Sequence, residues 1–128
     1  MIGLDTNILI RYFTRDDEEQ CQQATELIQA GEKCFITNIV LCEMVWVLKG
    51  EPYKFSKGDI LETIEAMLHS PTFEFENTSA VYQALQRTRE GRADFSDYMI
   101  EAISRQYGCL QTASFDKKLR GEDGFRCL

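Results

Sequence analysis

The sequence has few of the residues from which several familiar sites are built. It contains one histidine and five cysteines, and no two cysteines have the C-x-x-C spacing. A zinc site made of cysteine and histidine is therefore not expected. An odd number of unpaired cysteines is typical of small buried side chains in a reducing cytosol, and two of them lie within apolar runs. The five are Cys21, Cys34, Cys42, Cys109 and Cys127, with Cys42 and Cys109 in the apolar runs.

Long apolar runs are also missing. None approaches the 18 or so residues that a membrane-spanning helix needs, and no basic leader precedes Asp5, so we expect no secretory signal and a cytoplasmic protein. The length of 128 residues predicts one domain, residues 1–128, without room for a second core. A hydrophobic fraction of 44% is ordinary for a globular protein.

Basic residues are scarce relative to acidic ones. The chain has 14 lysines and arginines against 21 aspartates and glutamates, which gives a formal charge of −7. This excess argues against a broad nucleic-acid-binding surface. It does not exclude a nuclease, because carboxylates that bind divalent cations are counted here without their metal.

The first ten residues, MIGLDTNILI, contain the first candidate site residue. Apolar residues 1–4 predict a short buried strand, and Asp5 follows directly. Ligands of parallel α/β sheets bind just beyond the carboxyl ends of the strands, so Asp5 is placed where such a site would begin. The alternative is that Asp5 caps the helix expected over residues 6–13, since aspartate is a favoured N-cap.

Glu43 is the second candidate. It lies in the run NIVLCEMVWVLKG, residues 38–50, whose apolar side chains cover nearly the whole circumference of a helix. Such a helix is expected to be buried. A buried carboxylate is costly unless it is paired or bound to a metal. The alternative is a narrow polar stripe, or a bond from Glu43 to a basic neighbour.

The rest of the chain alternates between strand and helix patterns. Ser56 and Asp59 form a capping box before a helix that reaches His69. Short strands are expected at 33–37, 73–76, 109–113 and 124–128, with further helices ending near Gly31 and spanning 78–90. This alternation predicts an α/β sandwich around a short, mainly parallel sheet, covered by helices on both faces.

Two more acids follow in the C-terminal part. Ser96 is expected to cap a helix that has Asp97 at its first position, with Asp94 three residues before it. The buried face of this helix is predicted to consist of Met99, Ile100, Ile103 and Tyr107. Asp116 comes just after the strand expected at 109–113.

Four acids therefore belong to strand ends or helices that a parallel sheet would bring to one edge: Asp5, Glu43, Asp97 and Asp116. Each has an ordinary explanation as a cap or dipole partner. Together they would repel one another unless a cation neutralised them. Carboxylate oxygens without histidine or cysteine suit Mg²⁺ or Mn²⁺, ions that activate water in phosphoryl transfer.

Several segments resemble the PIN-domain nucleases, in particular the VapC-type toxins of bacterial toxin–antitoxin pairs. They are LDTNILI at the start, Glu43 within its apolar helix, ADFSDYMIEA and TASFDKKL. The resemblance runs nearly end to end and keeps the order of the four acids. It implies a three-layer α/β/α fold, Mg²⁺- or Mn²⁺-dependent endoribonuclease activity, inhibition by a cognate antitoxin protein and formation of homodimers.

The resemblance also implies roles for individual residues. Asp5 and Asp97 match the principal metal ligands, and Glu43 and Asp116 match the acids that complete the site. Asp94 matches an acid often found in its segment. Positions that shape the pocket by hydrogen bonding are matched by Thr6, Asn7 and Ser114, the last standing where threonine is common. Candidate contacts to the RNA backbone, whose alternative is solvated surface, are Arg11, Arg15, Arg92, Lys117 and Lys118.

The implied reaction is hydrolysis of an RNA phosphodiester by metal-activated water, leaving a 5′-phosphate. No serine or cysteine with a histidine partner is evident, so covalent catalysis is not expected. One rival class is the phosphatases of the haloacid-dehalogenase type, but these place a second aspartate where this chain has Asn7. The other rival is a PIN-like binding module without nuclease activity, and a module of that kind has no reason to retain four acids.

Overall fold

The computed structural model describes residues 1–128, which form two compact units. Unit 1 comprises Met1–Thr78 and unit 2 comprises Ser79–Leu128. No helix in either unit has both the length and the apolar character needed to cross a bilayer.

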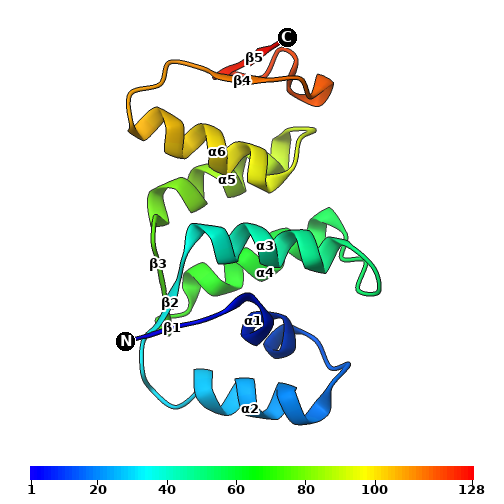
Figure 1. The fold of residues 1–128 in the computed structure, drawn as a ribbon, viewed down its shortest axis with the longest axis vertical. Coiled ribbons are helices and arrows are strands. Elements are labelled where there is room, and N and C mark those ends of the chain that lie inside the picture. The colour runs from blue at the N-terminus through cyan, green and yellow to red at the C-terminus, as the bar shows by residue number, and fades with distance from the viewer. The chain divides into compact units, whose positions relative to one another are not determined.

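Unit 1 is built on a parallel sheet of three very short strands (Figure 1). The strands are β1 (Ile2–Gly3), β2 (Cys34–Ile36) and β3 (Phe73–Phe75), paired in the order β1-β2-β3. Cys34 lies opposite both Ile2 and Phe73 in the register. All three carboxyl ends therefore point to the same edge of this sheet, as the alternation of patterns predicted.

Two pairs of helices connect these strands. They are α1 (Thr6–Phe13) and α2 (Glu18–Ile28) between β1 and β2, then α3 (Asn38–Lys49) and α4 (Lys57–His69) between β2 and β3. Helix α1 packs against both α2 and α3. Apolar side chains from all these layers fill the core, with Leu9, Met44, Leu48 and Ile64 fully excluded from solvent.

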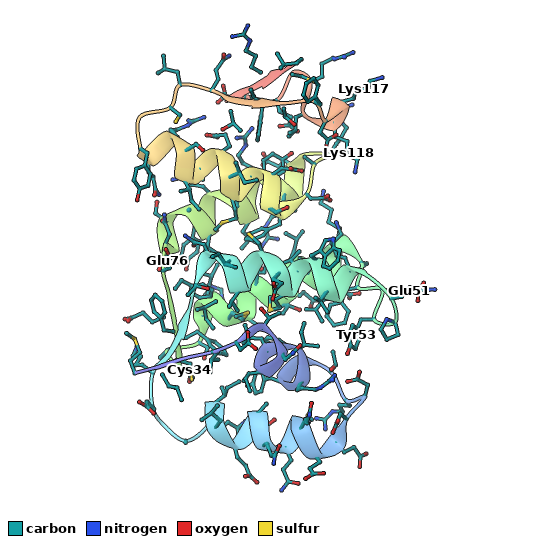
Figure 2. All side chains as sticks on the ribbon, in the orientation of Figure 1. Cys34, Glu51, Tyr53, Glu76, Lys117 and Lys118 are labelled. Atoms are coloured by element: carbon teal, nitrogen blue, oxygen red, sulfur yellow. The ribbon has the colours of Figure 1, made fainter.

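Caps fix where the helices begin. Thr37 Oγ1 accepts a hydrogen bond from the Val40 amide at 3.1 Å, as expected for an N-cap. Glu76, which follows β3, accepts one from the Asn38 amide at 2.9 Å and so satisfies a second donor of α3 (Figure 2). The capping box of Ser56 and Asp59 at the start of α4 is confirmed.

The prediction that α3 is buried on all sides is wrong. Ile39 and Trp46 are 77% and 78% exposed, and Glu43 between them is exposed as well. These positions are four and three residues apart and so share one face of the helix. The buried face is formed instead by Leu41, Met44, Val45 and Leu48. Glu43 therefore does not carry the cost of burial that the sequence suggested.

Unit 2 contains helices α5 (Thr78–Glu90, beginning at the last residue of unit 1) and α6 (Phe95–Gln106). A two-stranded parallel sheet follows, formed by β4 (Thr112–Ser114) and β5 (Phe125–Cys127), with the 3-10 turn η1 (Lys117–Leu119) between them. Helix α6 contacts β4, and η1 contacts β5.

Helix α6 departs from the sequence prediction at its start and on its face. It begins at Phe95 with Asp94 as N-cap, so Ser96 is not the cap and Asp97 is the third helical residue. Ile100 and Tyr107, predicted to be buried, are 53% and 85% exposed. The buried positions are Phe95, Tyr98, Met99, Glu101 and Ala102. Placing the cap at Ser96 shifted the expected apolar face around the helix.

A buried ion-pair network joins α5 to α6, and no pattern in the sequence predicted it. Glu101 is only 5% exposed, and its carboxylate accepts hydrogen bonds from Arg87 at 2.7 Å and from Arg105 at 3.0 Å. The Arg87 guanidinium also lies 4.9 Å from the Tyr98 ring centroid and 5.5 Å from that of Phe125. These contacts supply the pairing that a buried carboxylate requires.

The five cysteines are all free. Cys21 and Cys34 are buried, and Cys42 and Cys127 are partly so. Cys109 is exposed, so its predicted burial is wrong. It lies in the turn between α6 and β4, because that strand begins at Thr112 rather than at residue 109.

Candidate metal centre

Asp5 occupies the position that the sequence predicted, directly beyond β1. Its backbone has the extended conformation of an N-cap residue, with φ −80° and ψ 158°, but its side chain makes no capping hydrogen bond to α1. The carboxylate is exposed. The capping alternative therefore accounts for the backbone of Asp5 but leaves its carboxylate free for a ligand.

Thr6, the first residue of α1, carries an unsatisfied polar atom. The residue is 4% exposed, and its Oγ1 is buried without a hydrogen-bond partner. Leaving a buried hydroxyl unpaired costs about 1–3 kcal/mol. Such orphaned atoms require an explanation, and an ion or water site next to Asp5 is one. Asn7, the next residue, is exposed.

Glu43 is the second acid of unit 1 and is presented by α3, the helix that packs against α1. Its exposed carboxylate has no ion-pair partner, so the alternative in which a basic neighbour neutralises it does not apply. Unit 1 therefore offers two uncommitted carboxylates, Asp5 and Glu43, on elements that contact each other.

In unit 2, Asp97 and Asp116 are both half-buried and each is oriented by a backbone amide. The Asp94 amide donates to Asp97 Oδ2 at 3.1 Å. The Lys118 amide donates to Asp116 Oδ1 at 2.9 Å, and the Asp116 amide donates to Ser114 Oγ at 3.0 Å. Ser114 thus shapes the turn that carries Asp116, which gives a physical basis for its predicted accessory role.

The electrostatics of Asp97 distinguish it from an ordinary helix cap. Burial raises the pKa of its carboxyl above the usual value, and the neighbouring charges of Asp94 and Asp116 raise it further. The Asp94 amide and the Lys118 charge act in the opposite direction without cancelling the increase. A divalent cation beside these acids would favour the ionised form and relieve the repulsion.

The chemistry of this donor set fits Mg²⁺ or Mn²⁺, which bind carboxylate oxygens. Within unit 2 the structure brings Asp97 close to both Asp94 and Asp116. It does not gather three or more acidic, histidine or cysteine side chains into a ready-made metal-binding group. The four-acid site predicted from the sequence remains a prediction.

The predicted RNA contacts fall into two groups. Arg11 is already engaged, since its guanidinium donates to Gln20 at 2.6 Å, to Asp16 at 3.1 Å and to Tyr53 at 3.2 Å. These bonds tie the start of α2 to the loop before α4. The other cations are exposed on the surface: Arg15, Arg92, Lys117 and Lys118.

Short parallel strands joined by helices, with acids beyond β1 and β4 and in α3 and α6, define an α/β protein with a candidate divalent-cation site. A family model of the PIN domain matches residues 2–121, a range that includes all four acids and extends through both units. The chain therefore belongs to the PIN-domain family, which confirms the resemblance and the expected α/β/α fold class.

The chain is also similar to a protein that is named as a ribonuclease. The chain is 28% identical over 120 residues to a protein of Aquifex aeolicus (strain VF5) named VapC ribonuclease. The alignment covers 91% of this chain and 88% of that relative, so the two proteins match over nearly their whole lengths.

Proposed function

We propose that this protein is a metal-dependent endoribonuclease and the toxin of a type II toxin–antitoxin pair, with residues 1–128 acting as one PIN domain. Membership of the PIN-domain family and the likeness to a protein named VapC ribonuclease support the proposal. The observation that carries it is the position of Asp97, whose half-buried carboxyl lies near those of Asp94 and Asp116. Its ionised form is disfavoured unless a cation binds there.

Asp5 and Asp97 are the principal residues that would hold Mg²⁺ or Mn²⁺, and Glu43 and Asp116 would complete the site. A divalent ion held there would supply a Lewis acid that activates water and stabilises negative charge on the phosphate. The Asp94 amide keeps Asp97 in place, and Ser114 does the same for the turn of Asp116. Thr6 and Asn7, the two residues that follow Asp5, would shape the pocket by hydrogen bonding.

The proposed endoribonuclease function includes a substrate-binding surface and a defined product. The protein hydrolyses an RNA phosphodiester with water as nucleophile and leaves a 5′-phosphate. The exposed cations Arg15, Arg92, Lys117 and Lys118 contact the RNA backbone, whereas Arg11 contributes less because its donors are already bonded.

The protein acts in the cytoplasm, where it forms a homodimer and is inhibited by a cognate antitoxin protein. Light scattering of the purified chain tests the dimer, and co-expression with the neighbouring gene product tests the antitoxin. The competing function is a PIN-like binding module, which would bind the same partners without cleaving RNA. The nuclease function is supported by Asp5 and Glu43, whose carboxylates have no partner, and by Asp97, whose ionised form is disfavoured without a cation.

The decisive activity test is the substitution Asp97→Asn, assayed with Mn²⁺ on labelled RNA oligonucleotides. We expect cleavage to fall by at least about 100-fold, since even residues that only support a metal ligand are worth 10–100-fold. The matched control is Asp123→Asn in the same unit, whose side chain is 93% exposed, and this variant should cleave like the wild type. Unchanged cleavage by a folded Asp97→Asn protein would show that the site is misassigned.

A further inference from the structure

The two lysines that follow Asp116 are not equivalent. Both are exposed on the short turn η1. Figure 2 shows the Lys118 side chain on the side of η1 that faces α6, and the Lys117 side chain on the outer side. Because Asp97 lies in the first turn of α6, Lys118 is the lysine directed toward the acids of unit 2.

The backbone of Lys118 is held on both sides. Its amide donates to Asp116 Oδ1 at 2.9 Å, and the next residue, Leu119, is 1% exposed and anchors the turn in the core. The start of the side chain is therefore fixed relative to Asp116, and only the flexible four-carbon stem remains to be positioned. A lysine on a free surface loop would lack this restriction.

The ammonium of Lys118 is close to the acids but not committed to them. The Lys118 amide is bonded to the Asp116 carboxylate, and the Lys118 side chain lies on the side of η1 that faces α6 (Figure 2). No carboxylate lies within ion-pair distance of it, however. All three of its N–H donors are therefore available to a ligand at the acidic cluster.

We propose that Lys118 contacts the RNA phosphate that is cleaved and stabilises the negative charge developing on it during hydrolysis. This role rests on the proposed nuclease function and adds a phosphate-contacting residue to it. A phosphate that approaches the carboxylates of Asp97 and Asp116 is repelled, and added positive charge reduces that repulsion. A lysine held on the turn of Asp116 would supply positive charge to such a phosphate.

The test separates kcat from KM for Lys118→Gln, Lys118→Arg and the wild type, with Mn²⁺ and whichever labelled RNA oligonucleotide the wild type cleaves fastest. We expect Lys118→Gln to lower kcat roughly 10- to 100-fold, as for the loss of other donors to developing charge. Lys118→Arg retains the charge and should restore most of the rate. The control Arg120→Gln removes an exposed charge two residues away and should keep the wild-type kcat.

Lys117→Gln serves as the comparison, because Lys117 is expected to make only a general contact to the RNA backbone. This variant should therefore raise KM and leave kcat unchanged. Loss of such a contact raises KM and reduces the salt dependence of binding without changing kcat. An unchanged kcat for Lys118→Gln would overturn the inference. So would a loss of activity that accompanies a lower thermal stability and is not restored by Lys118→Arg, because Lys118 would then be structural.

The same measurements distinguish a failure of the proposed nuclease function from a failure of the inference about Lys118. If the wild type cleaves no RNA with Mg²⁺ or Mn²⁺, or if Asp97→Asn cleaves as well as the wild type, the nuclease assignment is wrong. The proposed role of Lys118 is then wrong as well. If the wild type cleaves, Asp97→Asn does not and Lys118→Gln keeps its kcat, only the inference about Lys118 is wrong.

Discussion

The surroundings of Asp97 both stabilise its carboxylate and oppose its charge. As the third residue of α6, Asp97 accepts a hydrogen bond from the Asp94 amide at 3.1 Å, and this contact stabilises the start of the helix. Burial and the charges of Asp94 and Asp116 nevertheless raise the pKa of its carboxyl, so the charged form is disfavoured. A side chain selected only to cap a helix would not be placed where its charge is opposed.

This conflict predicts how Asp97→Asn changes stability with pH. An acid whose pKa rises on folding binds protons more readily in the folded state, so its ionisation lowers the free energy of unfolding as the pH rises past the unfolded value of 3.8. Without metal, Asp97→Asn should therefore be as stable as the wild type near pH 4 and more stable near pH 7, by about 0.5 kcal/mol since the group is partly solvated. Urea unfolding at both pH values measures the difference.

Added Mn²⁺ should reverse the order, because only the wild type gains stability from the bound ion. A variant that is less stable than the wild type by the same amount at every pH, with and without Mn²⁺, would indicate that Asp97 is simply a cap.

At the scale of elements, the segment after η1 is constrained by the Glu101 network. Gly121 and Gly124 both have positive φ, at +81° and +82°. A Cβ at Gly121 would meet nothing within 4 Å, whereas one at Gly124 would lie 2.8 Å from both Arg105 Nη2 and Glu101 Cδ. The bend before β5 therefore passes directly over the buried carboxylate and its partner.

Alanine at these two glycines separates backbone strain from crowding. Gly121→Ala should cost about 1 kcal/mol of unfolding free energy, which is the penalty of the left-handed conformation alone. Gly124→Ala should cost more, roughly 3 kcal/mol, since it also forces the Glu101–Arg105 pair apart. Guanidinium unfolding of both variants measures this. Equal losses would mean that the network adjusts freely.

At the scale of the whole molecule, most elements and the local positions of two of the four acids could be predicted from the sequence. Short runs of apolar residues predicted β1 and β2, and the alternating run at 73–76 predicted β3. Asp5 and Asp116 follow strands as expected. The environment of Glu43 could not be predicted, because a helix with apolar residues all round gives no sign of which of them stay exposed. Only packing against α1 and α4 determines that face.

The start of α6 was missed for a related reason. Asp94 and Ser96 are both good caps, and the choice between them depends on contacts distant in sequence, such as the hydrogen bond from Tyr98 to Glu122 at 2.8 Å. The Glu101 network was missed because Glu101 and Arg87 are 14 residues apart on different helices. The family match then connects the acids of both units to one kind of domain.

Mn²⁺ binding followed by electron paramagnetic resonance tests most directly the claim that Asp5 and Asp97 are metal ligands. The wild type is compared with Asp5→Asn in unit 1, Asp97→Asn in unit 2 and the control Asp123→Asn. We predict that each of the first two raises the dissociation constant at least about tenfold, and that the control leaves it unchanged. Mn²⁺ binding that survives either substitution, or no binding at millimolar Mn²⁺, would contradict this claim.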